Sequence, residues 1–288
     1  MCCAILCAVF SQEKEDLASN PGAPKSYGKF SSSYLSNSVF NGRKDSVTTP
    51  YLTPTIGYYD KSGFYITGAL SYLSSAAASR IDLFNIEAGY DFNINKLDGE
   101  VTVFKSFYNS SSTNVKSEVS GGVASSFGYD LGFIHPTLLA GINLGKSTDF
   151  TAAFSLDHSF YAAEDKLEIV PSFLVNASTQ HYYGNYYANR KYAKLKKKNG
   201  GTGIYYDITA DLTDASRFKI LDYEFSLPIN YTVNKFTIGL TPAYALPVNP
   251  TIVTVNLKPS NGNNTISKTF NEKLENTFFF TFELSYKF

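Results

Sequence analysis

The sequence predicts an all-β protein, a closed antiparallel transmembrane β-barrel of about 12 strands. Apolar and polar residues alternate along segments of about 11 to 13 residues, which is longer than strands of soluble sheets and long enough for a tilted strand to cross a bilayer. The 288 residues include 23 Phe and 22 Tyr, and only 17% of all residues are charged. No apolar run reaches about 18 residues, so transmembrane helices are excluded.

The charge balance and the motif content exclude several other classes of protein. The chain has 25 Lys+Arg and 25 Asp+Glu residues, so it lacks the basic excess of a nucleic-acid-binding protein. The sequence has no metal-ligand spacing, phosphate-binding loop or dinucleotide motif. We therefore expect no nucleic-acid partner, no cofactor and no metal.

The N-terminus has the pattern of a secretory signal peptide. Residues 1–10 are apolar and contain all 3 Cys residues, and a polar stretch begins at Ser11. We expect residues 1–11 to be cleaved and residues 12–26 to form a periplasmic tail. The usual basic stretch is missing, which suggests a truncated signal peptide, and a buried first strand is the alternative. Without its Cys residues the mature chain would form no disulfide.

The predicted strands follow one another along residues 27–288. In each strand we expect the apolar phase to face lipid and the other phase to face the lumen. Two strands are weakly marked: residues 27–40 are rich in Ser, and in residues 101–108 the phase slips at Phe104, which suggests a bulge. The other predicted strands are residues 52–58, 64–72, 84–92, 136–144, 150–160, 167–177, 204–212, 221–233, 236–246 and 278–288.

The connections alternate between tight turns and longer polar loops. We predict tight turns at residues 60–63, 93–99, 145–149 and 233–235, and longer loops at 41–47, 74–79, 109–128 and 249–271. An outer-membrane barrel has short periplasmic turns and longer outer loops, and an even number of strands places both termini in the periplasm. One connection does not fit, because a basic insert with helical potential at residues 181–203 is long but would be periplasmic. Counts of 10 or 14 strands therefore stay open.

The last seven residues resemble the C-terminal signature of Gram-negative outer-membrane β-barrel proteins. Phe282, Leu284, Tyr286 and Phe288 alternate with polar residues, and Phe is the final residue. In that superfamily the barrel-assembly machinery recognises the last strand. The resemblance implies that these four residues form an assembly signal and that the protein lies in the outer membrane, in contact with its lipid. It extends over the general pattern of residues 27–288 and matches no particular branch.

The polar phase of the strands is rich in carboxylates. A lumen of this kind would favour cations or cationic groups on a solute. In the alternative interpretation the acids pair with bases such as Lys29 and Lys105, because interior charges are normally paired. The candidate selectivity residues are Glu87, Asp91, Asp157, Glu168, Asp207, Asp211, Asp222, Glu224 and Glu283, and Lys287 is the main base.

The tyrosines and histidines have simpler interpretations than a catalytic site. Tyrosine pairs near strand ends are expected to belong to aromatic girdles at the membrane interfaces or to flank them, and stacking platforms for a carbohydrate are the alternative. His158 lies in the lipid-facing phase while its neighbours Asp157 and Ser159 lie in the opposite phase, so they do not form a catalytic triad. We therefore do not predict an enzyme. The tyrosine pairs begin at Tyr58, Tyr182, Tyr186 and Tyr205.

Taken together, these features predict a channel or small-solute uptake protein of the outer membrane. The expected partners are a small solute, membrane lipid and the assembly machinery. A non-conducting structural or adhesion barrel that binds partners through its outer loops is the alternative. A lipid-modifying outer-membrane enzyme is the third hypothesis.

Overall fold

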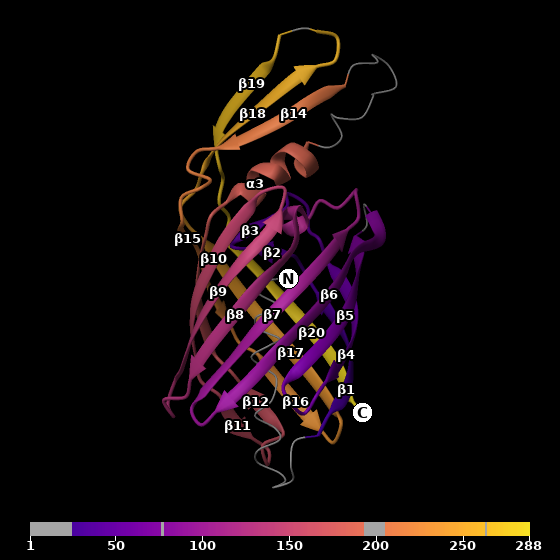
Figure 1. Cartoon of the computed structure of the whole chain (residues 1–288), viewed down its shortest axis with the longest axis vertical. Coiled ribbons are helices and arrows are strands. Elements are labelled where there is room, and N and C mark those ends of the chain that lie inside the picture. Colours follow the sequence, from indigo (N-terminus) through magenta and orange to yellow (C-terminus); the bar gives the residue numbers. More distant parts are fainter. Residues whose placement is uncertain (1–24, 76–77, 193–204, 263) are drawn as a thin grey trace.

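The computed structural model describes residues 25–75, 78–192, 205–262 and 264–288, and it is a closed antiparallel β-barrel of 12 wall strands (Figure 1). The predicted fold class is therefore confirmed. The expected signal peptide and most of the expected tail lie outside the described residues. In order around the barrel the wall strands are β1 (Tyr27–Leu35), β4 (Tyr51–Tyr59), β5 (Phe64–Ser75), β6 (Ala78–Ile94), β7 (Leu97–Tyr108), β8 (Val119–Tyr129), β9 (His135–Gly145), β10 (Thr148–Asp157), β13 (Ser172–Ser178), β15 (Lys219–Ser226), β17 (Phe236–Pro247) and β20 (Thr277–Lys287).

The barrel closes between its first and last strands. β20 pairs with both β17 and β1, and the backbones of Gly28 and Phe288 exchange hydrogen bonds of 2.9 and 2.8 Å. Both ends of the barrel sequence therefore lie at the same end of the barrel, which we call the turn end. Three short strands extend the wall there: β11 (Phe160–Ala162), β12 (Leu167–Ile169) and β16 (Ile229–Val233).

The other end, which we call the loop end, carries the longer connections. It holds a hairpin of β2 (Val39–Phe40) and β3 (Arg43–Lys44), the 3-10 helix η1 (Val115–Glu118), and the α-helix α3 (His181–Tyr186) followed by the π-helix η2 (Tyr187–Lys191). A three-stranded sheet of β14 (Tyr206–Leu212), β18 (Ile252–Pro259) and β19 (Ile266–Asn271) stands beyond the helices (Figure 1).

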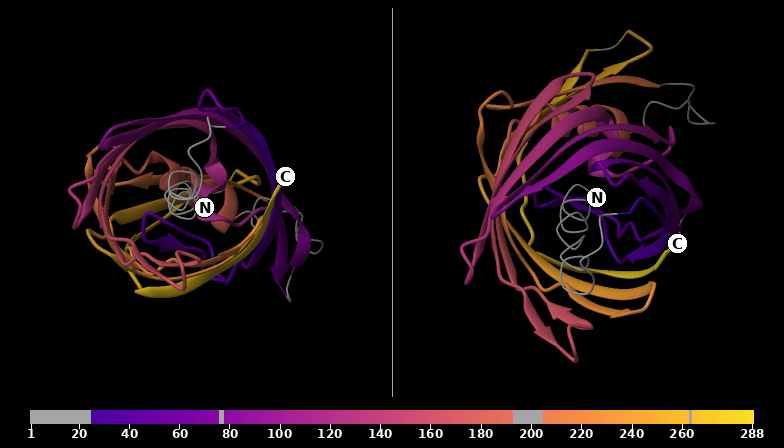
Figure 2. Two further views of the ribbon diagram at one scale, coloured as in Figure 1. Left: turned by 90° about the horizontal axis from the view of Figure 1, so that it is seen from below. Right: turned by 60° about the horizontal axis from the view of Figure 1, so that its bottom comes forward.

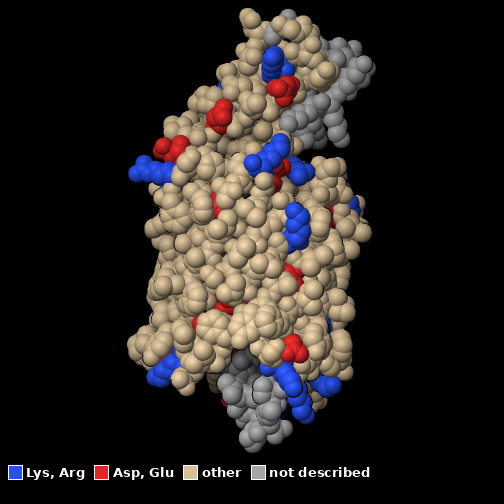
Figure 3. All heavy atoms as spheres, in the orientation of Figure 1, with Lys and Arg blue, Asp and Glu red and all other residues tan. Residues whose placement is uncertain are grey.

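The outer wall is apolar along its length. Phe64, Leu138 and Phe278 leave 63%, 62% and 63% of their surface exposed, in phase with aromatic and aliphatic neighbours. Figure 3 shows few charged side chains along the wall and more at its ends. Exposing so continuous an apolar surface to water is unfavourable. A closed barrel leaves no backbone edge unpaired in lipid. This wall is therefore a membrane-spanning surface.

None of the helices in the described ranges is both long enough and apolar enough to cross a membrane.

Neighbouring residues near the middle of β17 provide a test of the two faces. Leu240 lies on the exposed outer face and Thr241 on the inner face. We expect Leu240→Lys to cost about 2–4 kcal/mol, because the ammonium must enter the bilayer interior. The fraction of folded, heat-modifiable protein on gels would fall. Thr241→Lys is the matched control and should fold normally, and equal loss in both variants would contradict the assignment of faces.

The predicted number of strands is correct, but two of the predicted assignments are wrong. Residues 119–129 form β8, where a long loop was predicted, and residues 206–212 form β14 outside the barrel, where a wall strand was predicted. The sequence does not predict β8, because its Gly, Ala and Ser residues weaken the alternation of apolar and polar positions. β14 alternates because one of its faces packs on the helices at the loop end.

These two errors explain why the long insert at residues 181–203 was predicted at the periplasmic end of the barrel. With β8 included in the barrel, the long connection between β13 and β15 falls at the loop end, as the helices α3 and η2 do. Residues 193–203 of the predicted insert lie outside the described residues. The turn predicted at 145–149 also lies at the loop end, between β9 and β10.

The predicted slip in phase at Phe104 is absent. β7 keeps one register with β6 from Leu97 to Tyr108, and no bulge is needed. Lys105 simply lies on the outer face and Phe104 on the inner face. Lys105 therefore does not serve as an ion-pair partner for carboxylates in the lumen.

Candidate functional site

The mouth of the barrel at the loop end is closed by segments that fold into it. The β2–β3 hairpin turns at Asn41 and Gly42, whose φ angles of 48° and 70° fit the Asn-Gly turn of a two-residue hairpin. A Cβ at Gly42 would lie only 2.7 Å from Cβ of Asp222 and 2.9 Å from Cβ of Pro247. The tip of the hairpin therefore presses against the inner wall at β15 and β17. We call this hairpin together with η1, α3 and η2 the plug. Figure 1 shows α3 at the rim of the barrel, and in the view from below in Figure 2 ribbon segments overlap the opening of the ring.

Arg43 fixes the hairpin of the plug. Its guanidinium is buried and binds both carboxylate oxygens of Glu272, at 3.1 and 3.3 Å. It also donates to the carbonyl oxygens of Leu221 at 2.6 Å and Val248 at 3.1 Å, on two further segments. Such a bidentate pair is strong only when its remaining donors are satisfied, as they are here. One side chain thus joins the hairpin to β15 and to both ends of the connection that carries β18 and β19.

Asp149 fixes the start of α3. This buried carboxylate, at the start of β10, accepts hydrogen bonds of 2.7 Å from the backbone N–H groups of both His181 and Tyr182. It also accepts from the hydroxyl of Thr179 at 2.7 Å. The first turn of a helix has unpaired N–H donors, and here a residue of the barrel wall satisfies them. The helix is therefore tied to the wall as well as packed on it.

The tyrosines of α3 and η2 form the core of the plug. Tyr182, Tyr183, Tyr186 and Tyr187 are all buried and pack with apolar residues of the hairpin, η1, β14 and β18. Tyr186 donates a hydrogen bond of 2.9 Å to Asp45. Burial raises the pKa of Tyr182 and of Tyr183, so both phenols remain neutral. These residues are not an interfacial girdle as predicted, because the segment folds over the barrel mouth.

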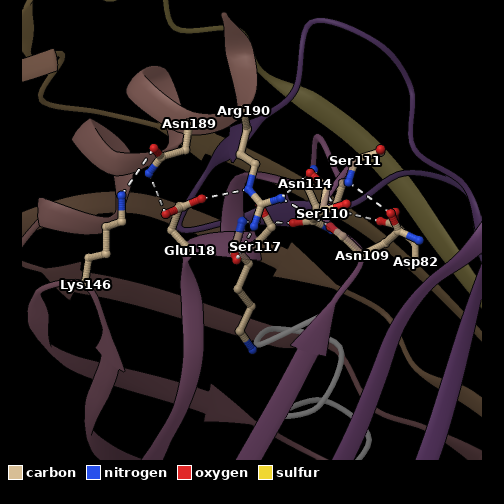
Figure 4. Close-up of polar contacts among 12 residues, drawn as sticks. Asp82, Asn109, Ser110, Ser111, Asn114, Ser117, Glu118, Lys146, Asn189 and Arg190 are labelled. Carbon is tan, nitrogen blue, oxygen red and sulfur yellow. Dashed lines mark hydrogen bonds and ion pairs between the residues drawn. The ribbon is translucent and has the colours of Figure 1, made fainter. Parts of the chain in front are cut away.

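A second ion pair joins η2 to the connection between β7 and β8 (Figure 4). Arg190 Nε binds Glu118 Oε1 at 2.7 Å, and the same guanidinium donates to the carbonyl oxygens of Asn109 and Ser110. Asn189 donates to the other oxygen of Glu118 at 2.9 Å. The plug is therefore held by side chains from several connections that lie far apart in the sequence.

A cavity lies beneath the plug, on the inner face of β6 to β13. Its atom-free space, counted together with the open solvent that adjoins it, is about 880 Å³. Small residues such as Ala124, Gly141 and Ala153 line it and leave room between the walls. Phe40 and Lys116 reach it from the plug. The side chains of the described residues therefore do not fill the lumen at this level.

Most of the predicted lumen carboxylates lie on the inner face, in several separate groups. Asp222 and Glu224 are buried close to the plug, while Glu283 pairs with Lys29 at 3.8 Å lower in the barrel. Glu168 lies in the extension at the turn end and accepts hydrogen bonds from Tyr161 and Asn230. The remaining residues of the inner face are Glu87 and Asp91 on β6, Asp157 on β10, and the base Lys287 on β20.

Two of the predicted lumen residues are not in the lumen. Asp207 and Asp211 lie on β14, in the three-stranded sheet beyond the mouth, where they are opposite Lys258 and Thr254 of β18. They alternate with residues that pack on the plug, and this produced a pattern like that of a wall strand. Their prediction as selectivity residues was therefore wrong.

His135 lies on the inner face and forms an ion cluster. Its Nε2 lies 2.7 Å from Asp98 and its Nδ1 lies 3.5 Å from Asp157. The cluster joins β7, β9 and β10 near the turn end. A general base needs a nucleophile within hydrogen-bond reach. The hydroxyl of Thr137 lies 3.3 Å from Nδ1, and both ring nitrogens also face carboxylates, so the arrangement is that of an ion cluster.

Sequence reasoning missed several residues of the site. Glu100 lies on the inner face beside Glu87. It is not among the predicted lumen residues, because the predicted strand begins at Val101. Extending the alternation of Val101 and Val103 back by one position would have found it. Arg43 and Lys116 gave no such signal, because they lie in connections whose path depends on long-range contacts.

Comparisons with known proteins give only distant likenesses. No family model matches the chain, and no curated protein matches it. Among solved structures, a KdgM porin is 7% identical, covering 90% of this chain and 99% of the porin, with a TM-score of 0.46. An outer-membrane channel from Pseudomonas putida F1 is 11% identical, covering 93% and 99%, with a TM-score of 0.47. A NanC porin is 9% identical, covering 90% and 98%, with a TM-score of 0.43. At these sequence identities and TM-scores, none of the three structures assigns an activity to this chain.

Proposed function

We propose that the chain is an integral outer-membrane β-barrel that passes small solutes through a polar, acid-leaning lumen, and that the plug closes its outer mouth. The observation that carries this proposal is the cavity directly beneath the plug, lined in part by small and polar residues. A barrel that served only as a scaffold would gain stability from filling this space with side chains. The barrel-assembly machinery remains the proposed partner of β20 and its outward row from Phe282 to Phe288.

The carboxylates of the inner wall suggest a preference for cations. Asp222 and Glu224 lie just below the tip of the hairpin, so a solute entering from the loop end would meet them early. A ring or group of carboxylates in a narrow pore concentrates cations and repels anions. These two residues are therefore the proposed selectivity residues for the open state.

Neutralising this pair should change the ion selectivity of the pore. We expect the double variant Asp222→Asn with Glu224→Gln to lower the cation-to-anion permeability ratio by about twofold or more. The measurement is the reversal potential of the purified protein in planar bilayers under a KCl gradient. The control removes the same charge outside the barrel, with Asp207→Asn and Asp211→Asn. An unchanged reversal potential in the first variant would refute the acidic selectivity site.

A second candidate function follows from the closed mouth and the sheet above it. β14, β18 and β19 stand clear of the wall, and the face of the sheet turned away from the plug is polar, with Thr254 bonded to Thr269 and Asn256 to Ser267. A non-conducting barrel that presents this sheet to partners would have the same features. Bilayer recordings distinguish the two functions, because such a barrel should remain silent even when the plug is loosened.

A further inference from the structure

We infer that the cavity beneath the plug is a binding site for a small zwitterion, a solute that carries both an amine and a carboxylate together with an apolar group. This inference rests on the proposed function, because it names the class of solute that the lumen would take. Four features of the cavity support it. They are a buried lysine, a pair of carboxylates, an unpartnered amide and a group of apolar side chains.

Lys116 provides the positive side of the site. It is only 3% exposed, and its ammonium lies 5.6 Å from the ring centre of Phe40 and 5.2 Å from that of Phe104. Among the described residues its ammonium forms no ion pair and no hydrogen bond. Two aromatic faces stabilise a buried ammonium but leave its hydrogen-bond donors unused. An anionic group in the cavity would complete its coordination.

Glu87 and Glu100 provide the negative side. The hydroxyl of Tyr65 contacts both carboxylates, donating to Glu100 and lying 3.4 Å from Glu87, and it lies 2.7 Å from the hydroxyl of Thr102. Thr102 also donates to Glu100 at 2.6 Å. When both carboxylates are ionised, these four side chains share two hydroxyl hydrogens, which is too few for two carboxylates with several acceptor sites each. A cationic ammonium would supply the missing donors.

An unpartnered amide offers a further point of attachment. Asn143 lines the same cavity and is 4% exposed, and its Nδ2 donates no hydrogen bond to the described residues. A buried donor without an acceptor costs free energy that a bound ligand would recover. Because the amide is a donor, it matches a carboxylate oxygen on the ligand, as Lys116 does.

The combination of these groups selects the class of ligand. A purely cationic solute would leave the ammonium of Lys116 without a hydrogen-bond acceptor, and a purely anionic solute would be repelled by Glu87 and Glu100. A zwitterion satisfies both sides. The rings of Phe40 and Phe104, with Leu139 and the small residues of the wall, leave an apolar surface for the rest of the molecule. An amino acid with an apolar side chain has this chemistry.

A binding experiment with three related probes tests the site. The full chain is refolded in detergent and titrated by calorimetry with L-phenylalanine, with its methyl ester, which is only cationic, and with N-acetyl-L-phenylalanine, which is only anionic. We expect the zwitterion to bind about tenfold more tightly than either derivative, because each derivative loses one charge-assisted contact. Equal binding of all three, tighter binding of one derivative, or no binding of any would overturn the inference.

Variants then assign the two sides. Lys116→Met should weaken binding of L-phenylalanine about tenfold without weakening binding of the methyl ester, and Lys116→Arg should restore it. Glu87→Gln should weaken binding of L-phenylalanine and of the methyl ester. The controls are Lys105→Met on the outer wall and Glu164→Gln in an exposed turn. Folding of each variant is checked by heat-modifiable mobility, and unchanged affinity in folded Lys116→Met would refute the site.

The outcomes also separate this inference from the proposed function. If the protein conducts ions but binds none of the three probes, the ligand class is wrong and the channel stands. If it binds L-phenylalanine with the expected selectivity but never conducts, even with the plug loosened, the site stands as that of a non-conducting receptor and the channel is wrong.

Discussion

Replacing Arg43 with alanine is expected to open the loop-end mouth. The substitution leaves Glu272 buried without its guanidinium and removes the hydrogen bonds that tie the hairpin to Leu221 and Val248. Breaking a buried pair in this way costs about 3–5 kcal/mol. If most of that cost falls on the closed state, the ratio of open to closed mouths rises roughly 10²- to 10³-fold. Bilayer recordings should show rare openings in the parent protein and frequent or permanent openings in the variant.

The chain offers a matched control for this prediction. Arg217 forms a pair with Asp214 at 4.0 Å, and its side chain is 74% exposed. An exposed pair of this kind contributes little, so Arg217→Ala should leave the recordings unchanged. Arg43→Lys should give an intermediate result, because it keeps the charge but loses the two-pronged geometry. A folded Arg43→Ala barrel that stays silent would favour the non-conducting barrel over the channel.

Replacing Asp149 with alanine should release α3 from the barrel wall. The variant leaves the first backbone N–H groups of the helix and the hydroxyl of Thr179 without their acceptor. Hydrogen bonds to a charged group contribute about 1.5–3 kcal/mol each but do not add fully, so we expect a loss of about 3 kcal/mol in plug stability. Transient opening of the helix should then be roughly 100-fold more frequent.

Chymotrypsin provides the measurement, because it cleaves after tyrosine. The four tyrosines of α3 and η2 are between 1% and 5% exposed, so they should resist cleavage in the parent protein. In folded Asp149→Ala, peptides ending at Tyr182 to Tyr187 should appear much faster in mass spectra. Asp165→Ala, in the turn between β11 and β12, is the control. Cleavage at the parent rate would show that packing alone holds the helix.

The sequence by itself determined the wall of the barrel. Alternation with period two depends only on the two environments that a strand separates, so clearly alternating strands of the wall, such as residues 278–288, had their faces assigned correctly. The placement of Glu87, Asp222 and Glu224 on the inner face followed from the same rule. The total of 12 strands agreed with the structure, although a missed β8 was offset by the wrongly included β14.

The plug and the cavity were decided only by the tertiary structure. Period two reports that one face of a strand is apolar, but not whether lipid or protein covers it, so β14 on its helices resembled a wall strand. β8 was lost because Gly, Ala and Ser residues fit either environment. The mouth is closed by contacts such as Arg43 with Glu272 and Asp149 with α3, which join residues far apart in the chain. No local pattern specifies such contacts, because their free energy exists only when both partners are already in place.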